Sequence, residues 1–341
     1  MKPTTVIHAA KPGGPATPTL VNCAAYSANG TRLPTLTVEA ISDHIEAADG
    51  FVWIGLHEPD AAMLAVMQGE FGLHDLAIED AANAHQRPKI EVYGDGLFIA
   101  LHTAQMIKGH IEFGETHIFL NQRSLLTIRH GASLSYAPAR LRCEREPHLL
   151  KLGPSYALYA VLDFIVDNFS PIVSEFEDEL AALEKDIFNA TYKDGQTVKR
   201  LYELKRELVT LRLAVSPMQD ILNQLVRFHA GLVHDDVRLY FRDVLDHAVR
   251  VNEATDTVRE MLTAAMGVHL SLVTVSQGEV VKRLAGWAGL IAAPTLITSW
   301  YGMNFVHMPE LAHPASYWIV MGLTASVCIG LFITLKRAKW L

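Results

Sequence analysis

The stretch YGMNFVHMPEL, residues 301–311, separates two long apolar segments near the end of the chain. The first segment reads LAGWAGLIAAPTLITSW (284–300), and the second reads SYWIVMGLTASVCIGLFITL (316–335). Neither contains Asp, Glu, Lys or Arg, and each has about the 20 residues that an α-helix needs to cross the hydrocarbon core of a bilayer. The segments therefore predict two transmembrane helices, 284–304 and 316–335, joined by an extracytoplasmic loop at 305–315.

Basic residues lie only at the outer ends of these two segments. Two precede the first segment at 282–283, and three follow the second within the tail 336–341, whereas the loop contains none. Because cytoplasmic flanks carry the excess of Lys and Arg, both termini are expected in the cytoplasm. The sequence thus predicts a multi-pass protein of the plasma membrane, or of the inner membrane in a bacterium.

The bulk composition excludes several classes of protein. The chain has 341 residues, of which half are hydrophobic, and a net charge of −8, so it is no candidate for nucleic-acid binding. Its three cysteines, Cys23, Cys143 and Cys328, are far apart, which predicts neither a zinc cluster nor a disulfide framework. The first 20 residues lack an apolar core, so we expect a loose tail and not a signal peptide.

Residues 1–150 have the pattern of an α+β cytoplasmic domain, an antiparallel sheet with helices. The run FVWIGL (51–56) predicts a buried strand, and the segments 59–72 and 73–84 predict helices. Across 89–131, apolar and polar residues alternate between Gly and Asn breaks. This alternation predicts an antiparallel meander of four or five strands.

Residues 151–283 have the pattern of long stalk helices. Apolar residues at spacings of three and four over 161–187 predict one amphipathic helix. A second helix is expected over 198–217, ending at a proline, and a third over 235–302, where no strong turn signal intervenes. If continuous, the third helix is about 100 Å long. We expect it to couple the cytoplasmic domain mechanically to the first membrane segment.

No enzyme signature is present, because the chain has no HExxH, P-loop, GxSxG or strand-linked GxGxxG motif. We therefore predict that the protein is not an enzyme. Two histidine pairs, His229 with His234 and His307 with His313, are candidates for metal ligation. Scattered histidines are more often surface or packed residues, and the pattern alone leaves both interpretations open.

With these elements in place, the chain resembles the CorA family of magnesium and cobalt transport proteins, the GMN-type metal ion transporters. The resemblance rests on YGMNF (301–305), MPEL (308–311) and KRAKWL (336–341), with HQRPKIE (85–91) and YFRDVLDH (240–247) further upstream. A GMN sequence between two terminal apolar segments, followed by MPEL, is highly specific. The resemblance covers nearly the whole chain.

The resemblance implies a homopentamer in the lipid bilayer, with the first membrane helices lining a pore for Mg²⁺, Co²⁺ and, as a further candidate, Ni²⁺. It implies that Gly302, Met303 and Asn304 form an outer selectivity ring. Mg²⁺ releases its waters reluctantly, and a ring of neutral carboxamides can accept hydrogen bonds from those waters and still release the ion. The same three residues also suit a helix C-cap. Glu310 is expected at the outer mouth, where it either concentrates cations or is a solvated loop acid.

Within the first membrane segment, the resemblance assigns two residues to the pore. Thr295 matches a pore-lining threonine, and Leu284 matches an apolar constriction that blocks ions by dewetting. The sequence departs from the family at three other pore positions. Gly278 stands where relatives have asparagine, while Val281 and Ala292 replace bulkier methionines. The inner constriction is therefore expected to be wider or differently gated.

The resemblance also implies regulation by intracellular Mg²⁺. Asp80 and Asp243 match acids that bind the ion between subunits and hold the pore shut. An ion between facing acids removes their repulsion, so low Mg²⁺ is expected to loosen the ring and open the gate. A third family acid is Gly267 here. No ATP site is apparent, and an inside-negative potential favours entry of a divalent ion by about 4.6 kcal/mol per 100 mV.

Two alternatives remain open at this point. The first is a zinc transporter of the same fold, which intact GMN and MPEL disfavour but which the altered pore residues leave in play. The second is a membrane-anchored cytosolic sensor or enzyme, whose apolar segments serve only as anchors. This second alternative predicts no ion flux, and an activity that survives removal of the chain from Lys282 onward.

Overall fold

The computed structural model describes residues 20–34, 36–47, 50–107, 110–188, 194–229, 231–304, 308 and 313–341. The chain divides into two compact units, Met1–Thr263 and Ala264–Leu341, referred to below as unit 1 and unit 2. The expected loose tail, except its last residue, lies outside the described residues.

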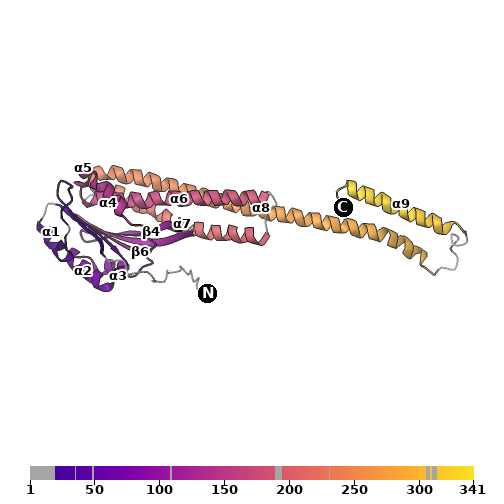
Figure 1. The fold of residues 1–341 in the computed structure, drawn as a ribbon, viewed down its shortest axis with the longest axis horizontal. Helices are drawn as coiled ribbons and strands as arrows, with labels where there is room; N and C mark the ends of the chain where they lie inside the picture. Colours follow the sequence, from indigo (N-terminus) through magenta and orange to yellow (C-terminus); the bar gives the residue numbers. More distant parts are fainter. Residues whose placement is uncertain are drawn as a thin grey trace. The chain divides into compact units, whose positions relative to one another are not determined.

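Unit 1 contains a six-stranded sheet with the strand order β1-β2-β6-β5-β4-β3 (Figure 1). The strands are β1 (Leu20–Tyr26), β2 (Phe51–His57), β3 (Lys89–Tyr93), β4 (Gly96–Ile107), β5 (His110–Asn121) and β6 (Ser124–Gly131). Strands β3 to β6 form the predicted antiparallel meander, which confirms the α+β class. The sheet as a whole is mixed and not wholly antiparallel, because β2 pairs with β6 in parallel.

The position of β2 inside the sheet follows from its composition. Five of its seven residues are buried, among them Trp53 at 2% exposure and Ile54 at 0%. A continuous apolar strand of this kind is stable only where both faces are covered and both edges are paired. Its neighbours β1 and β6 pair with its two edges. The predicted antiparallel meander alone does not account for a strand of this composition.

One face of the sheet packs against three short helices in unit 1. They are α1 (Ile41–Ala47), α2 (Ala61–Phe71) and α3 (Asp75–Ala82), with a 3₁₀ turn η1 (Val38–Ala40) before them. Asp60 caps α2 by accepting a hydrogen bond from Met63 N at 2.8 Å, and Gly72 ends it in the left-handed conformation. The side chain of His74 caps α3 in the same way, accepting from Leu76 N. These caps place α2 and α3 where the sequence predicted helices.

The other face of the sheet is covered by two long helices, α6 (Pro154–Phe188) and α7 (Asp194–Arg227) (Figure 1). Two short helices, α4 (Ala137–Glu144) and α5 (Pro147–Leu150), pack against α6. The apolar stripe predicted over 161–187 is buried along α6, with Phe169 at 1% exposure. The amphipathic pattern was therefore interpreted correctly, and it builds the second half of the unit 1 core.

The second stalk helix does not end at Pro217, so that prediction was wrong. Helix α7 continues for ten residues beyond the proline, to Arg227. A proline inside a helix removes one backbone hydrogen bond and crowds the preceding turn. Here the residues after it are buried, including Ile221, Leu222 and Leu225 at 2% exposure or less. Burial of this apolar stripe outweighs the local cost of the proline.

The predicted third helix is continuous and is α8, Asp235–Tyr301, with 67 residues. At 1.5 Å per residue its length is about 100 Å. Within unit 2, α8 is followed by α9 (Ser316–Arg337). The chain end returns to α8, since Lys282 Nζ lies 5.8 Å from the Trp340 ring centre, and Trp340 O would be 3.0 Å from a Cβ at position 286. Gly286 thus makes room for the terminal residues beside α8.

Three of the described helices are long and apolar enough to cross a membrane. They differ in burial: the apolar window of α6 is 61% buried within the protein, whereas those of α8 and α9 are 6% and 0% buried. Helix α6 therefore buries most of its apolar side chains inside unit 1. The apolar surfaces of α8 and α9 face outward, as expected for the segments predicted to span the bilayer.

Candidate ion pathway and cation sites

The five positions assigned to the pore lie on one face of α8. Gly278, Val281, Leu284, Ala292 and Thr295 are all exposed, and they follow one another at intervals of three, three, eight and three residues. At about 100° per residue they fall within a sector of about 120°. The same sector contains four further small residues: Ala285, Ala288, Ser299 and Gly302. Val281, Leu284 and Leu296 also lie in this sector and are exposed, so the face consists of small residues alone only between Ala285 and Thr295.

Hydroxyl groups near the end of α8 are oriented by the helix itself. Thr295 Oγ1 donates to Ile291 O at 2.8 Å, and Thr298 Oγ1 donates to Thr295 O at 3.0 Å. A hydroxyl has a single proton, so each of these oxygens is left only with lone pairs to offer. Such oxygens can accept hydrogen bonds from the water shell of a cation. They cannot donate to an anion without breaking the bond to the helix.

The three residues after α8 are placed at a helix C-terminus. Gly302 N donates to Thr298 O at 3.0 Å and Ser299 O at 3.2 Å, and Met303 N lies 3.4 Å from Trp300 O. Gly302 is not among the glycines with positive φ, and a Cβ there would meet only ordinary contacts, so the turn itself does not require glycine. Asn304 is exposed. The last turn of α8 contains no basic residue, so the partial negative charge of the helix end is available to cations.

The outer loop is mostly outside the described residues. Residues 305–307 and 309–312 are not described, so the position of Glu310 and the proposed pair of His307 with His313 remain predictions. The other histidine pair is described. His234 Nδ1 accepts from Asp236 N at 3.2 Å, and burial lowers the pKa of His229. No described contact joins His229 to His234, so this pair stays a prediction.

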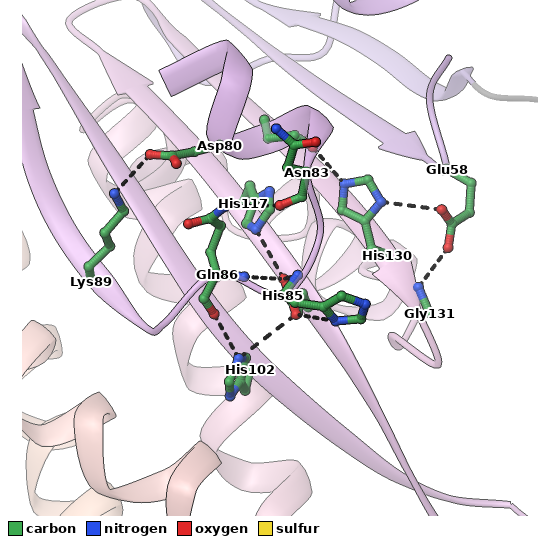
Figure 2. A network of polar contacts seen from close by, with 12 residues as sticks. Glu58, Asp80, Asn83, His85, Gln86, Lys89, His102, His117, His130 and Gly131 are labelled. Atoms are coloured by element: carbon green, nitrogen blue, oxygen red, sulfur yellow. Dashed lines mark hydrogen bonds and ion pairs between the residues drawn. The ribbon is translucent and has the colours of Figure 1, made fainter. Parts of the chain in front are cut away.

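Asp80, on α3, is held by a salt bridge within its own chain. Lys89 Nζ lies 2.8 Å from Asp80 Oδ2 and 2.8 Å from Glu91 Oε2 (Figure 2). Partial burial acts against the charged lysine, but its hydrogen bonds to Asp80 and Glu91 raise the Lys89 pKa above its ordinary value. Asp80 is therefore not a free carboxylate in the single chain. A cation binding there has to compete with Lys89.

Asp243, on α8, belongs to a different cluster. Its side chain is 67% exposed, and Oδ2 lies 3.9 Å from His247 Nε2. His247 in turn forms, with Asp163 and Asp167 of α6, a group whose ligand atoms all lie within 4.8 Å of one another. Within the described part of one chain, no contact joins Asp80 to Asp243.

Sequence reasoning missed this acidic cluster. Burial raises the pKa of Asp163, and nearby Asp167 adds to that effect, although Arg142 at 2.6 Å acts in the opposite direction. The signal in the sequence was the spacing: Asp163 and Asp167 are four residues apart, as are Asp243 and His247. Four-residue spacing places side chains on one helix face, but it does not say that the two faces meet.

A second unpredicted cluster surrounds Glu115 (Figure 2). Strand pairing places His102 of β4 and His130 of β6 opposite Glu115 of β5, and His117 lies two residues along the same face. His85, from the segment between α3 and β3, approaches the same carboxylate at 3.5 Å. Sequence alone could not reveal the cluster, because it depends on the register of three strands.

The Glu115 carboxylate is kept charged by its surroundings. Burial acts to raise its pKa, but His117 and the backbone N–H of His85 together hold the pKa below its ordinary value of 4.5. The pKa of Glu58 is lowered in a similar way: burial raises it, and Gly131 N and His130 more than compensate. Both carboxylates therefore stabilise the folded state above about pH 4.5, and that stability is lost as the pH falls through their lowered pKa values.

A pH experiment follows from these shifts. Glu115→Gln removes one of the two carboxylates with a lowered pKa, so the melting temperature of the variant is expected to fall less steeply between about pH 5.5 and 3.5 than that of the parent chain. Thermal unfolding of the full chain in detergent, followed by circular dichroism, measures both slopes. Equal slopes would show that Glu115 does not contribute to the acid sensitivity.

Comparison with known proteins identifies the family. Residues 48–337 match the family model described as "CorA-like Mg2+ transporter protein". The chain is 31% identical over 296 residues to the cobalt/magnesium transport protein CorA of Thermotoga maritima, covering 85% of this chain and 83% of that protein. It is 25% identical over 307 residues to the protein of the same description from Methanocaldococcus jannaschii, covering 89% of this chain and 96% of that one.

A solved structure has the same fold. The complete structure of the CorA magnesium transporter from M. jannaschii superimposes with a TM-score of 0.76 and 22% sequence identity, covering 94% of this chain and 99% of that chain. The match extends over the sheet unit, the long helix and the C-terminal apolar helix. The family match over most of the chain, the 31% identity to a CorA protein and the shared fold lead to one conclusion: the chain belongs to the CorA family of membrane transport proteins.

Proposed function

We propose that five copies of this chain form a channel through which Mg²⁺, and with it Co²⁺ and Ni²⁺, enters the cytoplasm. The observation that carries this proposal is the exposed face of small residues on α8, which ends at Gly302, Met303 and Asn304. Two membrane helices per chain cannot enclose a pore, so a ring of subunits is required. The descriptions of the family and of its cobalt and magnesium relatives support the choice of Mg²⁺ and Co²⁺.

The chemistry of the pore face suits a hydrated ion. Ala288 and Ala292 leave space along the face, and the Thr295 hydroxyl offers only lone pairs to a passing water shell. At the end of the helix, a ring of Asn304 carboxamides accepts hydrogen bonds from coordinated water without a full negative charge, so the ion can leave again. Leu284, 69% exposed in the single chain, forms an apolar ring nearer the cytoplasm that closes by dewetting.

The ends of unit 2 support the proposed orientation in the membrane. Lys282 precedes the membrane part of α8, and Trp340 at the chain end lies against it. The basic residues of both segments are therefore at the same end of the helical hairpin. By the positive-inside rule that end is cytoplasmic, which places both termini in the cytoplasm of a plasma-membrane protein. Driving force comes from the inside-negative potential, about 4.6 kcal/mol per 100 mV for a divalent ion.

Intracellular Mg²⁺ closes the channel by binding between subunits at Asp80 and Asp243. The exposure of Asp243 and the exposed acid Asp167 beside its His247 neighbour provide an electronegative surface for this purpose. Lys89 sets the sensitivity, because the incoming ion must displace it from Asp80. At low Mg²⁺, facing acids repel one another, the ring loosens, and the open state is favoured.

Two substitutions with opposite effects test this regulation. The double substitution Asp80→Ala with Asp243→Ala is expected to raise the internal Mg²⁺ concentration for half-inhibition by about tenfold or more, because the carboxylate ligands are lost. Lys89→Gln is expected to lower that concentration, because Asp80 loses its competing cation. Mg²⁺ uptake into liposomes loaded with a series of internal Mg²⁺ concentrations measures both. Unchanged inhibition in the double variant would reject these positions.

Reconstitution of the full chain into liposomes tests the function itself. Separate fluorescent indicators for Mg²⁺ and Zn²⁺ are placed inside, and an inside-negative potential is imposed. The proposal predicts Mg²⁺ entry that exceeds Zn²⁺ entry. Preferential Zn²⁺ entry would instead support a zinc transporter of the same fold, and absence of any flux would support an anchored cytosolic sensor or enzyme.

A further inference from the structure

The cluster around Glu115 contains more metal-binding groups than the proposed transport mechanism uses. Glu115 is 8% exposed, and its Oε1 lies 3.5 Å from His85 Nδ1 and 3.9 Å from His102 Nε2. Its Oε2 lies 3.4 Å from His117 Nε2. Figure 2 shows the imidazoles of His85, His102 and His117 converging from different segments. One carboxylate therefore faces three imidazoles.

The hydrogen bonding of Glu115 is uneven. Oε2 accepts the backbone N–H groups of His85 at 2.8 Å and Gln86 at 3.3 Å. Among the described residues, Oε1 accepts no hydrogen bond and has only the two imidazole nitrogens nearby. This oxygen therefore has lone pairs that no described donor occupies. It is the natural point of attachment for a cation.

His117 provides independent support for a ligand at this place. Its side chain is 0% exposed, and neither ring nitrogen has a hydrogen-bond partner of acceptable geometry. Its ring stands between His130 and Phe98, at centroid distances of 5.3 Å and 5.7 Å. Buried imidazoles are normally hydrogen-bonded or bound to a metal. His117 has no satisfied hydrogen bond, and it points at the Glu115 carboxylate.

We propose that Glu115, His85, His102 and His117 bind a divalent transition-metal ion, of the class of Co²⁺, Ni²⁺ or Zn²⁺, in the cytoplasmic unit. Imidazole nitrogen suits these ions, whereas Mg²⁺ prefers an all-oxygen shell. In a tetrahedral site with bonds of about 2.0–2.1 Å, neighbouring ligand atoms are about 3.3 Å apart. From Oε1, the separations to His85 Nδ1 and His102 Nε2, 3.5 and 3.9 Å, exceed this value by less than about 1 Å, whereas His117 Nε2 lies 3.4 Å from the other oxygen of the carboxylate, Oε2.

Binding requires the site to close. The four ligand atoms do not all lie within 4.8 Å of one another; among the described residues only Asp163, Asp167 and His247 meet that condition. The His85 side chain is 65% exposed, and His85 lies in a segment that is neither helix nor strand, so its ring can rotate inward. His102 Nε2 must also exchange its hydrogen bond to Gln86 O for the metal. Closure therefore moves the segment that contains His85 and Gln86.

This movement has a consequence for the proposed channel. The segment from Asn83 to Pro88 connects α3, which contains Asp80, to β3, which begins with Lys89. Figure 2 shows the Asp80–Lys89 ion pair beside the cluster. A transition-metal ion bound at Glu115 would thus change the stability of the Asp80–Lys89 ion pair, which sets the proposed response to Mg²⁺. This coupling rests on the proposed function, whereas the metal site itself does not.

Equilibrium binding to the full chain in detergent tests the site without any transport measurement. Co²⁺ is added in the presence of a large excess of Mg²⁺, which occupies oxygen-only sites, and bound Co²⁺ is measured by equilibrium dialysis and by its visible absorption. We expect one Mg²⁺-resistant Co²⁺ per chain with the spectrum of nitrogen ligation. Glu115→Gln and His85→Gln are each expected to weaken it at least about tenfold.

Two matched variants complete the experiment. His110→Gln removes an exposed histidine outside the cluster and is expected to leave Co²⁺ binding unchanged. Asp167→Asn removes a carboxylate from the cluster of Asp163, Asp167 and His247 and is also expected to leave Co²⁺ binding unchanged. His85 is exposed, so its variant should fold even if Glu115→Gln does not. The proposal is overturned if no Mg²⁺-resistant Co²⁺ binds, if His85→Gln binds normally, or if only Asp167→Asn loses the ion.

Discussion

Replacement of Asn304 by alanine is expected to reduce Mg²⁺ flux through the reconstituted chain by about tenfold to a hundredfold. Asn304 is exposed just beyond the end of α8, where five copies would form a ring of carboxamide oxygens. Hydrogen bonds between a neutral acceptor and a charged, hydrated ion are worth about 1.5–3 kcal/mol. Alanine removes all five acceptors at once while leaving the helix end intact. Initial rates of Mg²⁺ entry into liposomes measure the change.

Two further substitutions at the same position distinguish the effect of the carboxamide group from the effect of side-chain size. Asn304→Gln keeps the carboxamide on a longer side chain and should retain more flux than alanine. Asn304→Asp replaces neutral acceptors with a ring of charge, which is expected to bind the ion more tightly and release it more slowly. If the alanine variant conducts Mg²⁺ as well as the parent chain, Asn304 has no role in selection.

Replacement of Ala292 by tryptophan is expected to lower Mg²⁺ flux to the level of empty liposomes. Ala292 lies in the middle of the α8 face of small residues, between Ala288 and Thr295. If this face lines the pore, five indole rings would fill the space through which the hydrated ion passes. Because the side chain is exposed in the single chain, the substitution does not disturb a packed core.

Leu290→Trp is the matched control for this prediction. Position 290 is two residues earlier on the same helix, about 160° away around its axis at 100° per residue. It receives the same aromatic side chain on the opposite face. Retained flux in this control with no flux in Ala292→Trp would assign the pore to the small-residue face. Equal flux in both variants would place the ion pathway elsewhere.

The elements that the sequence predicted well are those governed by local patterns. The long apolar runs and the absence of turn signals predicted α8 and α9, and the stripe over 161–187 predicted α6. The alternation over 89–131 predicted the meander. In each case the physical information lies within a few turns or a few strand residues. Pro217 is the exception, because distant packing partners outweigh its local effect.

The parts that the sequence did not predict depend on which distant segments meet. The parallel pairing of β2 with β6 joins residues more than 70 positions apart. The ion pair of Lys89 with Asp80, the approach of His247 to Asp163, and the row of histidines around Glu115 all depend on tertiary contacts. Spacing could suggest which side chains share a face, but strand register and helix packing decide which faces meet.

Whether this chain conducts Mg²⁺ is tested most directly by the current across a planar bilayer that contains the purified chain. MgCl₂ is the only salt, and its concentration differs between the two sides. We expect a current that disappears in Ala292→Trp and whose reversal potential has the sign of the Mg²⁺ gradient. No current, or a current that reverses with the sign of the chloride gradient, would contradict it.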